Sequence, residues 1–188
     1  MQDIITKAKE YALNEIKQYG TPKLEHFEIA NQKWQMLAEK LGADKDIVMV
    51  GTILMDLKIG ECVSEWKIQE HVTRSSQAAQ KFLQDFEIEP EKLKKIIACI
   101  EQHHGTADYF FLEAEICANA DCYRFLHPRG ILSAFILFGR RDESTDNILT
   151  QVEKKMDEKF SILSLPICQE ELTPYYNQFK KLIAEARK

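Results

Sequence analysis

The stretch Asp46–Asp56, DIVMVGTILMD, is an almost unbroken apolar run that ends in a carboxylate. A helix that is apolar on all sides is typical of a protein core. The acid at its end, Asp56, therefore needs a partner, because a buried carboxylate is costly unless it is paired, hydrogen-bonded or bound to a metal ion. We predict that Asp56 belongs to a buried polar cluster.

Other segments supply side chains with which Asp56 can cluster. Four histidines and one acid occur on segments that each have an apolar helical face, and they are His26, His71, His103, His104 and Asp121. A single core-facing histidine is more often a hydrogen-bonded packing residue than a ligand. His103 and His104 can also simply favour the negative end of their helix. The ordered set as a whole favours a polar cluster between helices.

The composition restricts the class of protein. With 188 residues, 45% of them hydrophobic and 29% charged, the chain matches one globular domain with a real core. The net charge of -5 is no reason to expect nucleic acid as the main partner. No apolar run reaches the roughly 18 residues of a membrane span, and the N-terminus is amphipathic, so we expect a cytoplasmic protein without a membrane partner.

The five cysteines are odd in number and contain no CxxC pair, which predicts buried thiols and neither a disulfide framework nor a zinc ribbon. Helical periodicity predicts an all-α domain of about eight helices, with no competing strand pattern and with residues 58–66 as a loop. The segments expected to be helical are about 2–19, 23–41, 44–57, 67–86, 90–104, 112–126, 128–138, 147–160 and 173–186.

Imidazoles and carboxylates on rigid helices can hold Mn, Fe, Co, Ni or Zn. Such a metal lowers the pKa of bound water to about 7, and two metals about 4 Å apart can also clamp a phosphate. Phosphoester hydrolysis is the reaction that such a site suits best.

The order His26, Met55-Asp56, His71, His103-His104, Asp121 resembles the HD-domain metal-dependent phosphohydrolase superfamily, whose core pattern is H, HD, D. The resemblance covers about residues 24–126. It implies one compact HD-like domain over residues 1–188, with helices of about 128–188 packing on that core. The segment through Phe138-Gly139-Arg140 also resembles small stand-alone members that hydrolyse nucleotides or other phosphomonoesters.

The chain departs from the family pattern at Met55, because a thioether is a poor ligand for the harder divalent metals. The resemblance implies a first metal on His26, Asp56 and Asp121 with the lost histidine. It implies a second metal on Asp56, His71 and one of His103 or His104. Three outcomes stay open: an impaired one-metal enzyme, an enzyme that uses the second site, or a metal-free relic. Asn119 stands where an acid is more usual in the family, which is a second departure from the family pattern.

Charged side chains near the motif are candidates for contact with substrate. Lys67, Arg74 and Arg124 are expected to bind the phosphate of a small phosphorylated partner such as a nucleotide. Lys58 and Glu61 join Asp56 as catalytic candidates, Glu61 through proton transfer. The alternative for each charged group is an exposed surface position, and for the whole chain a phosphate-ligand-binding protein or a helical interaction module. The apolar segment 131–138 is expected to be core or a homodimer face.

Overall fold

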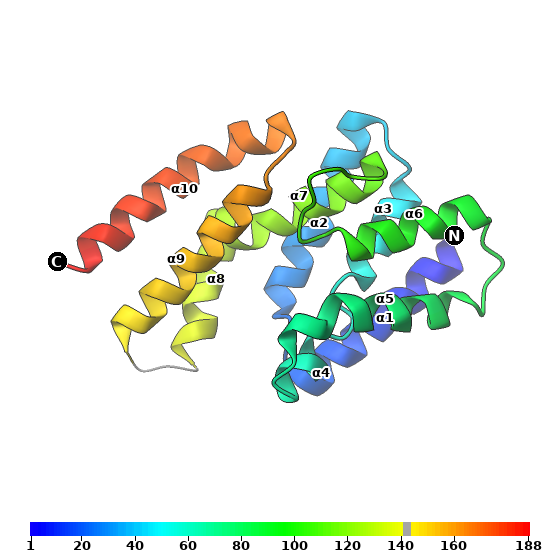
Figure 1. The fold of residues 1–188 in the computed structure, drawn as a ribbon, viewed down its shortest axis with the longest axis horizontal. Coiled ribbons are helices and arrows are strands. Elements are labelled where there is room, and N and C mark those ends of the chain that lie inside the picture. The colour runs from blue at the N-terminus through cyan, green and yellow to red at the C-terminus, as the bar shows by residue number, and fades with distance from the viewer. Residues whose placement is uncertain (141–143) are drawn as a thin grey trace.

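The computed structural model describes residues 1–140 and 144–188 (Figure 1). These residues form an all-α bundle without strands, so the predicted fold class is confirmed. Ten α-helices and one short 3-10 helix take the place of the expected eight: α1 (Gln2–Tyr19), α2 (Leu24–Leu41), α3 (Lys45–Leu54), α4 (Ile59–Ser64), η1 (Ile68–Glu70), α5 (His71–Leu83), α6 (Pro90–Glu101), α7 (Leu112–Leu126), α8 (Pro128–Gly139), α9 (Thr145–Ile162) and α10 (Pro166–Ala186).

The ends of the helices follow local chemistry that the sequence predicts. The Asp44 carboxylate accepts from the backbone N–H groups of Asp46 and Ile47, and so caps α3. Gly42 ends α2 in the left-handed region at φ 72°, which glycine adopts without steric cost. Pro90 stands at the start of α6, where its missing N–H is not needed.

Two predictions for the segment between α3 and α5 were wrong. Residues 58–66, expected as a loop, contain α4, which is too short for its periodicity to be read from sequence. The helix expected from residue 67 begins only at His71, after η1. Two further boundaries were wrong, because α3 ends at Leu54 and α6 at Glu101, which leaves Asp56, His103 and His104 in the turns that follow them.

The C-terminal helices are longer than expected. The last helix was predicted from Thr173 but begins at Pro166 and carries Pro174 inside it. Pro174 is exposed, so the backbone carbonyl that loses its N–H partner there can be hydrated. The segment between the predicted helices 128–138 and 147–160 includes residues 141–143, which lie outside the described residues.

Helix α3 is the centre of the core. Its Val48, Val50 and Leu54 are fully buried, and α3 contacts α1, α2, α6 and α7. Helices α8, α9 and α10 lie together at one end of the molecule, shown in yellow to red in Figure 1. Helix α9 packs on α7 and so reaches the buried segment that carries Asp121.

The five cysteines are all buried and unpaired, as predicted. Within residues 1–140 and 144–188, no helix has the length and apolar character needed to cross a membrane.

We expect Gly51→Ala to weaken the contact between α3 and α6. A Cβ at Gly51 would lie 2.4 Å from the Cβ of Cys99, so α6 must move. Overpacking of this kind should lower the free energy of unfolding by about 1–3 kcal/mol in urea denaturation. The control is Gly139→Ala, whose Cβ meets only Ile148 at 3.8 Å, and it should leave stability unchanged or raise it by up to about 1 kcal/mol. Equal effects of the two substitutions would contradict this account of the packing.

Candidate metal centre

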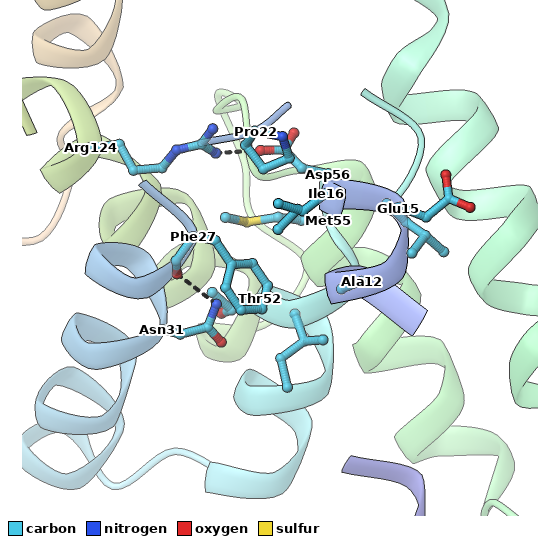
Figure 2. A pocket seen from close by; sticks show the side chains of 12 residues that line it. Ala12, Glu15, Ile16, Pro22, Phe27, Asn31, Thr52, Met55, Asp56 and Arg124 are labelled. Atoms are coloured by element: carbon cyan, nitrogen blue, oxygen red, sulfur yellow. Dashed lines mark hydrogen bonds and ion pairs between the residues drawn. The ribbon is translucent and has the colours of Figure 1, made fainter. Parts of the chain in front are cut away.

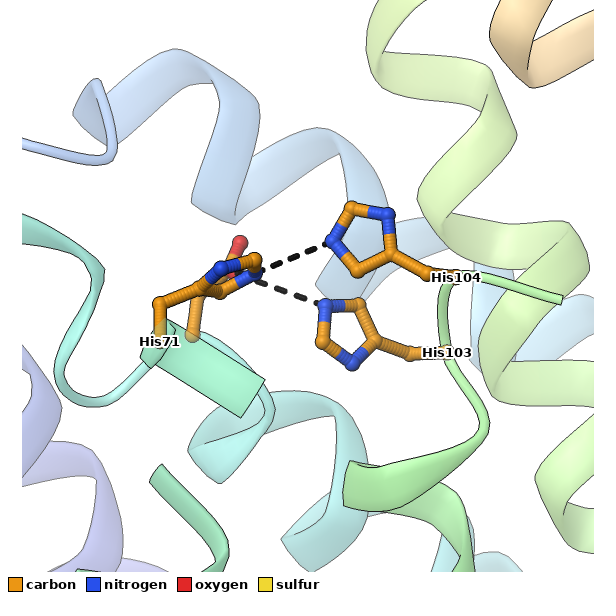
Figure 3. A group of neighbouring side chains, drawn as sticks. His71, His103 and His104 are labelled. Atoms are coloured by element: carbon orange, nitrogen blue, oxygen red, sulfur yellow. Dashed lines mark hydrogen bonds and ion pairs between the residues drawn. The ribbon is translucent and has the colours of Figure 1, made fainter. Parts of the chain in front are cut away.

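Four predicted site residues converge where three segments meet. Asp56 follows α3, His71 begins α5, and His103 and His104 lie in the turn after α6. One ligand atom from each of the four lies within 4.8 Å of the others. Figure 3 shows the three imidazoles pointing toward one another. This cluster can hold a metal ion.

The distances within the cluster leave two buried atoms without partners. Asp56 Oδ1 lies 3.7 Å from His71 Nε2 and 3.5 Å from His103 Nε2. Both Asp56 Oδ1 and His103 Nε2 are buried without a hydrogen-bond partner among the described residues. Since buried polar atoms are nearly always satisfied, this pair of orphaned acceptors fits a bound cation.

Backbone carbonyls orient two of the histidines. His71 Nδ1 donates to the carbonyl of Ile68 at 2.6 Å, and His103 Nδ1 donates to that of Ile100 at 2.7 Å. Each Nε2 is therefore the unprotonated nitrogen and faces the cluster, which is the usual arrangement of a metal-ligating histidine. Burial lowers the pKa of His71, and it lowers the pKa of His104 to about 4, so both imidazoles are neutral near pH 7.

The other oxygen of Asp56 belongs to a buried ion-pair network. Arg124 donates to Asp56 Oδ2 and, at 2.5 Å, to Asp121 Oδ1. Lys159 lies 2.6 Å from Asp121 Oδ2. Burial alone would raise the pKa of Asp56, but Arg124 and the neighbouring His103 and His71 together outweigh it and hold that pKa well below its usual range. Lys159 and Arg124 likewise outweigh burial at Asp121 and lower its pKa.

The set expected to hold a first metal does not fit one. His26 Nε2 lies 3.2 Å from the carbonyl oxygen of Gly130, and its ring meets the edge of Phe125. Met55 is buried and lines a small, mostly apolar pocket with Ile16 and Phe27, next to the Asp56–Arg124 pair (Figure 2). The carboxylates of this set are already neutralised by two side-chain cations.

Lys159 is the site residue that sequence reasoning missed. It lies on α9 with only 2% of its surface exposed, and its Nζ is 3.2 Å from His104 Nδ1. Burial would lower the pKa of Lys159, yet Asp121 outweighs it and the pKa is raised. A signal existed in the sequence, because Lys159 continues the apolar stripe of Val152 and Met156 at helical spacing.

Three of the predicted catalytic and substrate-binding residues form a surface network. Lys58 pairs with Glu15 and with Glu61 at 3.2 Å. Arg74 pairs with Glu61 at 3.2 Å and with two further glutamates, Glu65 and Glu70. This network ties α4 to α5 and to α1.

Two other predicted positions also lie away from the cluster. Lys67 is half exposed near Glu65. Asn119 Oδ1 accepts from the backbone N–H groups of Ser164 and Leu165, and its amide donates to Ser164 Oγ. The role of Asn119 in the structure is therefore to hold the segment between α9 and α10 against α7.

A pocket of ≈ 630 Å³, partly open to solvent, adjoins the cluster. Its polar wall includes His26, Asp56, His104, Asp121 and Arg124, together with Lys23, Lys155 and Lys159. Its apolar wall includes Pro22, Ile59, Val63, Ile68, Phe125, Leu137 and Phe138. Among the described residues that line it, Lys58, Glu61, Lys67 and Arg74 are not found. Of the predicted substrate-binding residues, Arg124 therefore lines the pocket, whereas Lys67 and Arg74 do not.

Comparison with known proteins gives one distant similarity. The chain is 30% identical to Ribonuclease Y of Finegoldia magna over 136 residues, which is 72% of this chain and 22% of that protein. The chain thus spans about a fifth of the length of this relative. No family model matches the chain, and no solved structure matches it.

We expect Met55→His to destabilise the protein without creating a second metal site. The imidazole would enter an apolar pocket beside the Arg124 guanidinium, and a buried polar group without a partner costs about 1–3 kcal/mol. The melting temperature should therefore fall by a similar margin with and without Mn or Co. The matched control is Met55→Leu, which keeps an apolar side chain and should change stability little. A rise in metal stoichiometry in Met55→His would instead show that His26, Asp56 and Asp121 form a poised site.

Proposed function

We propose that this chain is a single HD-type domain that hydrolyses a small phosphoester, such as a nucleotide, with a divalent transition metal. The observation that carries the proposal is the pair of buried atoms without partners, Asp56 Oδ1 and His103 Nε2, facing His71 Nε2. A carboxylate and two imidazoles that present acceptor atoms are ligands that Mn, Fe, Co, Ni and Zn accept.

The adjoining pocket supports a phosphorylated substrate. Lys23 and Lys155 bring positive charge to its wall, which suits the anionic oxygens of a phosphate, whereas the charge of Lys159 is paired with Asp121. Phe125 and Phe138 give the same pocket an apolar side, which suits the uncharged part of an ester such as a nucleobase. The net charge of the chain, -5, favours a small substrate over a long nucleic acid.

The residues divide the chemistry of hydrolysis between them. Asp56, His71 and His103 would hold a divalent cation, which would supply Lewis-acid stabilisation of the phosphoryl oxygens and a bound water of lowered pKa. Asp56 contributes one oxygen to the cluster, while Arg124 holds its other oxygen and fixes its orientation. Lys23 and Lys155 line the pocket and would place positive charge near a bound phosphate, where negative charge accumulates during the reaction.

The similarity to Ribonuclease Y supports a site that cleaves phosphoesters, because that protein is named as a ribonuclease. A phosphodiester therefore belongs among the substrates to be tested.

A second candidate is a protein that binds a phosphorylated ligand without hydrolysing it. The observation that favours it is the network of Arg124 and Lys159, which neutralises Asp121 and one oxygen of Asp56 without any metal. In that case the same pocket and lysines would bind the ligand, and the histidine cluster would bind no metal ion.

We expect the purified protein to hydrolyse at least one member of a panel of nucleoside monophosphates, dinucleotides and p-nitrophenyl phosphate when Mn or Co is present. Free phosphate or nitrophenol reports on the monoesters, and chromatography of the nucleoside and nucleotide products reports on the dinucleotides. Asp56→Asn, which keeps the shape of the side chain but weakens it as a ligand, should lower the rate at least 100-fold. Chelator treatment should do the same, and added metal should restore the wild-type rate. The control is Asp85→Asn, an exposed acid that should keep full activity.

The hydrolase proposal would be contradicted if no substrate of the panel is hydrolysed. If a nucleotide then still raises the melting temperature of both the wild type and Asp56→Asn, the ligand-binding protein is favoured. Circular dichroism of Asp56→Asn must show a folded protein, since removing one charge of a buried pair can cost about 3–5 kcal/mol.

A further inference from the structure

The hydrogen bonds behind the three histidines distinguish them from one another. His71 and His103 each place Nδ1 against a backbone carbonyl, those of Ile68 and Ile100. A carbonyl only accepts, so both Nδ1 atoms carry the proton and both Nε2 atoms are left with a lone pair. These two histidines therefore present acceptors to the cluster.

His104 has the opposite arrangement. Its Nδ1 lies 3.2 Å from Lys159 Nζ, and an ammonium group only donates. Glu158 Oε1 lies 3.7 Å from the same nitrogen, which is beyond hydrogen-bonding distance. The Nδ1 atom of His104 therefore accepts from Lys159, and the neutral ring carries its proton on Nε2. That nitrogen lies 3.0 Å from His71 Nε2, which is an acceptor by the argument above, and the contact is a normal hydrogen bond. His104 therefore presents an N–H group to the cluster, where the other two histidines present lone pairs.

The side chain of Lys159 is held in place by a buried ion pair. Its Nζ lies 2.6 Å from Asp121 Oδ2, and its side chain is 2% exposed. Asp121 is held in turn by Arg124 at 2.5 Å. A buried ammonium with a carboxylate at this distance keeps its proton, so its donor role toward His104 does not change near neutral pH.

We propose that Lys159 fixes His104 as an N–H donor, so that Asp56, His71 and His103 bind a single cation. The cation takes the lone pair of His71 that accepts from His104 in the metal-free protein, and the N–H of His104 is then released as a donor to the phosphoryl group in the pocket. This rests on the proposed function for the identity of the pocket's occupant, whereas the assignment of ligands does not. His104 lines the pocket and its side chain is 35% exposed, while His103 is fully buried. Lys159 acts here as a positioning residue for His104.

The first test reads the protons directly in the metal-free protein. Two-bond ¹H–¹⁵N correlation spectra of the imidazoles at pH 7.5 should show His71 and His103 protonated on Nδ1 and His104 protonated on Nε2. Lys159→Met should remove the Nε2 preference of His104 alone. A wild-type spectrum with His104 protonated on Nδ1 would overturn the proposal.

The second test measures metal binding without substrate, by isothermal titration with Co²⁺ and by the visible spectrum of the bound ion. The wild type should bind one equivalent. His104→Ala should keep that stoichiometry with a Kd within about threefold, whereas His71→Ala and His103→Ala should weaken binding at least 30-fold. The control is His127→Ala, which removes the one histidine that is neither in this cluster nor at the predicted first-metal position.

The outcomes separate this proposal from the proposed function. Loss of Co²⁺ binding in His104→Ala equal to that in His103→Ala, two equivalents in the wild type, or no binding at all would each overturn it. If the titrations come out as expected but no phosphoester is hydrolysed, the proposed function fails and the ligand assignment stands. If both hold, His104→Ala should lower kcat at least tenfold at full metal occupancy.

Lys159→Met supplies a conditional check, since it removes a buried charge and the variant must first be shown to fold. In that background His104 is free to turn its lone pair to the cluster, so adding His104→Ala should now weaken Co²⁺ binding at least tenfold. An unchanged Kd would argue against the positioning role of Lys159. If the variant does not fold, the wild-type spectra and the histidine series decide the question alone.

Discussion

The structure depends on a balance between two buried carboxylates, Asp56 and Asp121, and two buried cations, Arg124 and Lys159. They come from the turn after α3, from α7 and from α9, and so one network joins the centre of the core to the C-terminal helices. Breaking a buried pair leaves an uncompensated charge, at a cost of about 3–5 kcal/mol, which is a large part of the stability of a typical domain. The packing of α9 on α7 is therefore tied to the charge state of the site.

Asp56 connects this network to the histidine cluster because its two oxygens have different surroundings. Oδ2 accepts from Arg124, while Oδ1 faces His71 and His103 and has no partner among the described residues. The guanidinium fixes the plane of the carboxylate, so Oδ1 is aimed at the imidazoles without any ligand present. The pairing on one side is thus what prepares the binding position on the other.

The sequence could predict which residues belong to the cluster but not the different role of each. The order of Asp56, His71, His103 and His104 on apolar helices was sufficient to expect them together, and the structure brings ligand atoms of all four within 4.8 Å. It could not show that Arg124 points inward, because an arginine on a helix is usually exposed. Lys159 was out of reach for the same reason, although its place on an apolar stripe was visible.

The fold was predictable to a similar extent. Long periodic helices and their caps, such as Asp44 before α3, follow from local rules and were confirmed. Helix α4 was missed because six residues give too few turns to reveal a period, and the start of α10 was predicted at residue 173 although the helix begins at Pro166 and continues through Pro174. Both errors arise where tertiary contacts or solvent exposure decide the outcome.

Met55 and the two buried cations form a consistent electrostatic arrangement. Two ionised carboxylates close together repel each other unless positive charge lies between them. Arg124 and Lys159 supply two such charges within hydrogen-bonding distance of Asp121. Unit charges about 4 Å apart at an effective dielectric constant of about 20 interact by roughly 4 kcal/mol. A divalent ion added beside both cations would be repelled by them about as strongly as the two carboxylates attract it, so it would gain little there, with a thioether in place of an imidazole ligand. On the histidine side of Asp56, a divalent ion gains one carboxylate oxygen and the lone pairs of imidazole nitrogens. There it also lies farther from these two cations.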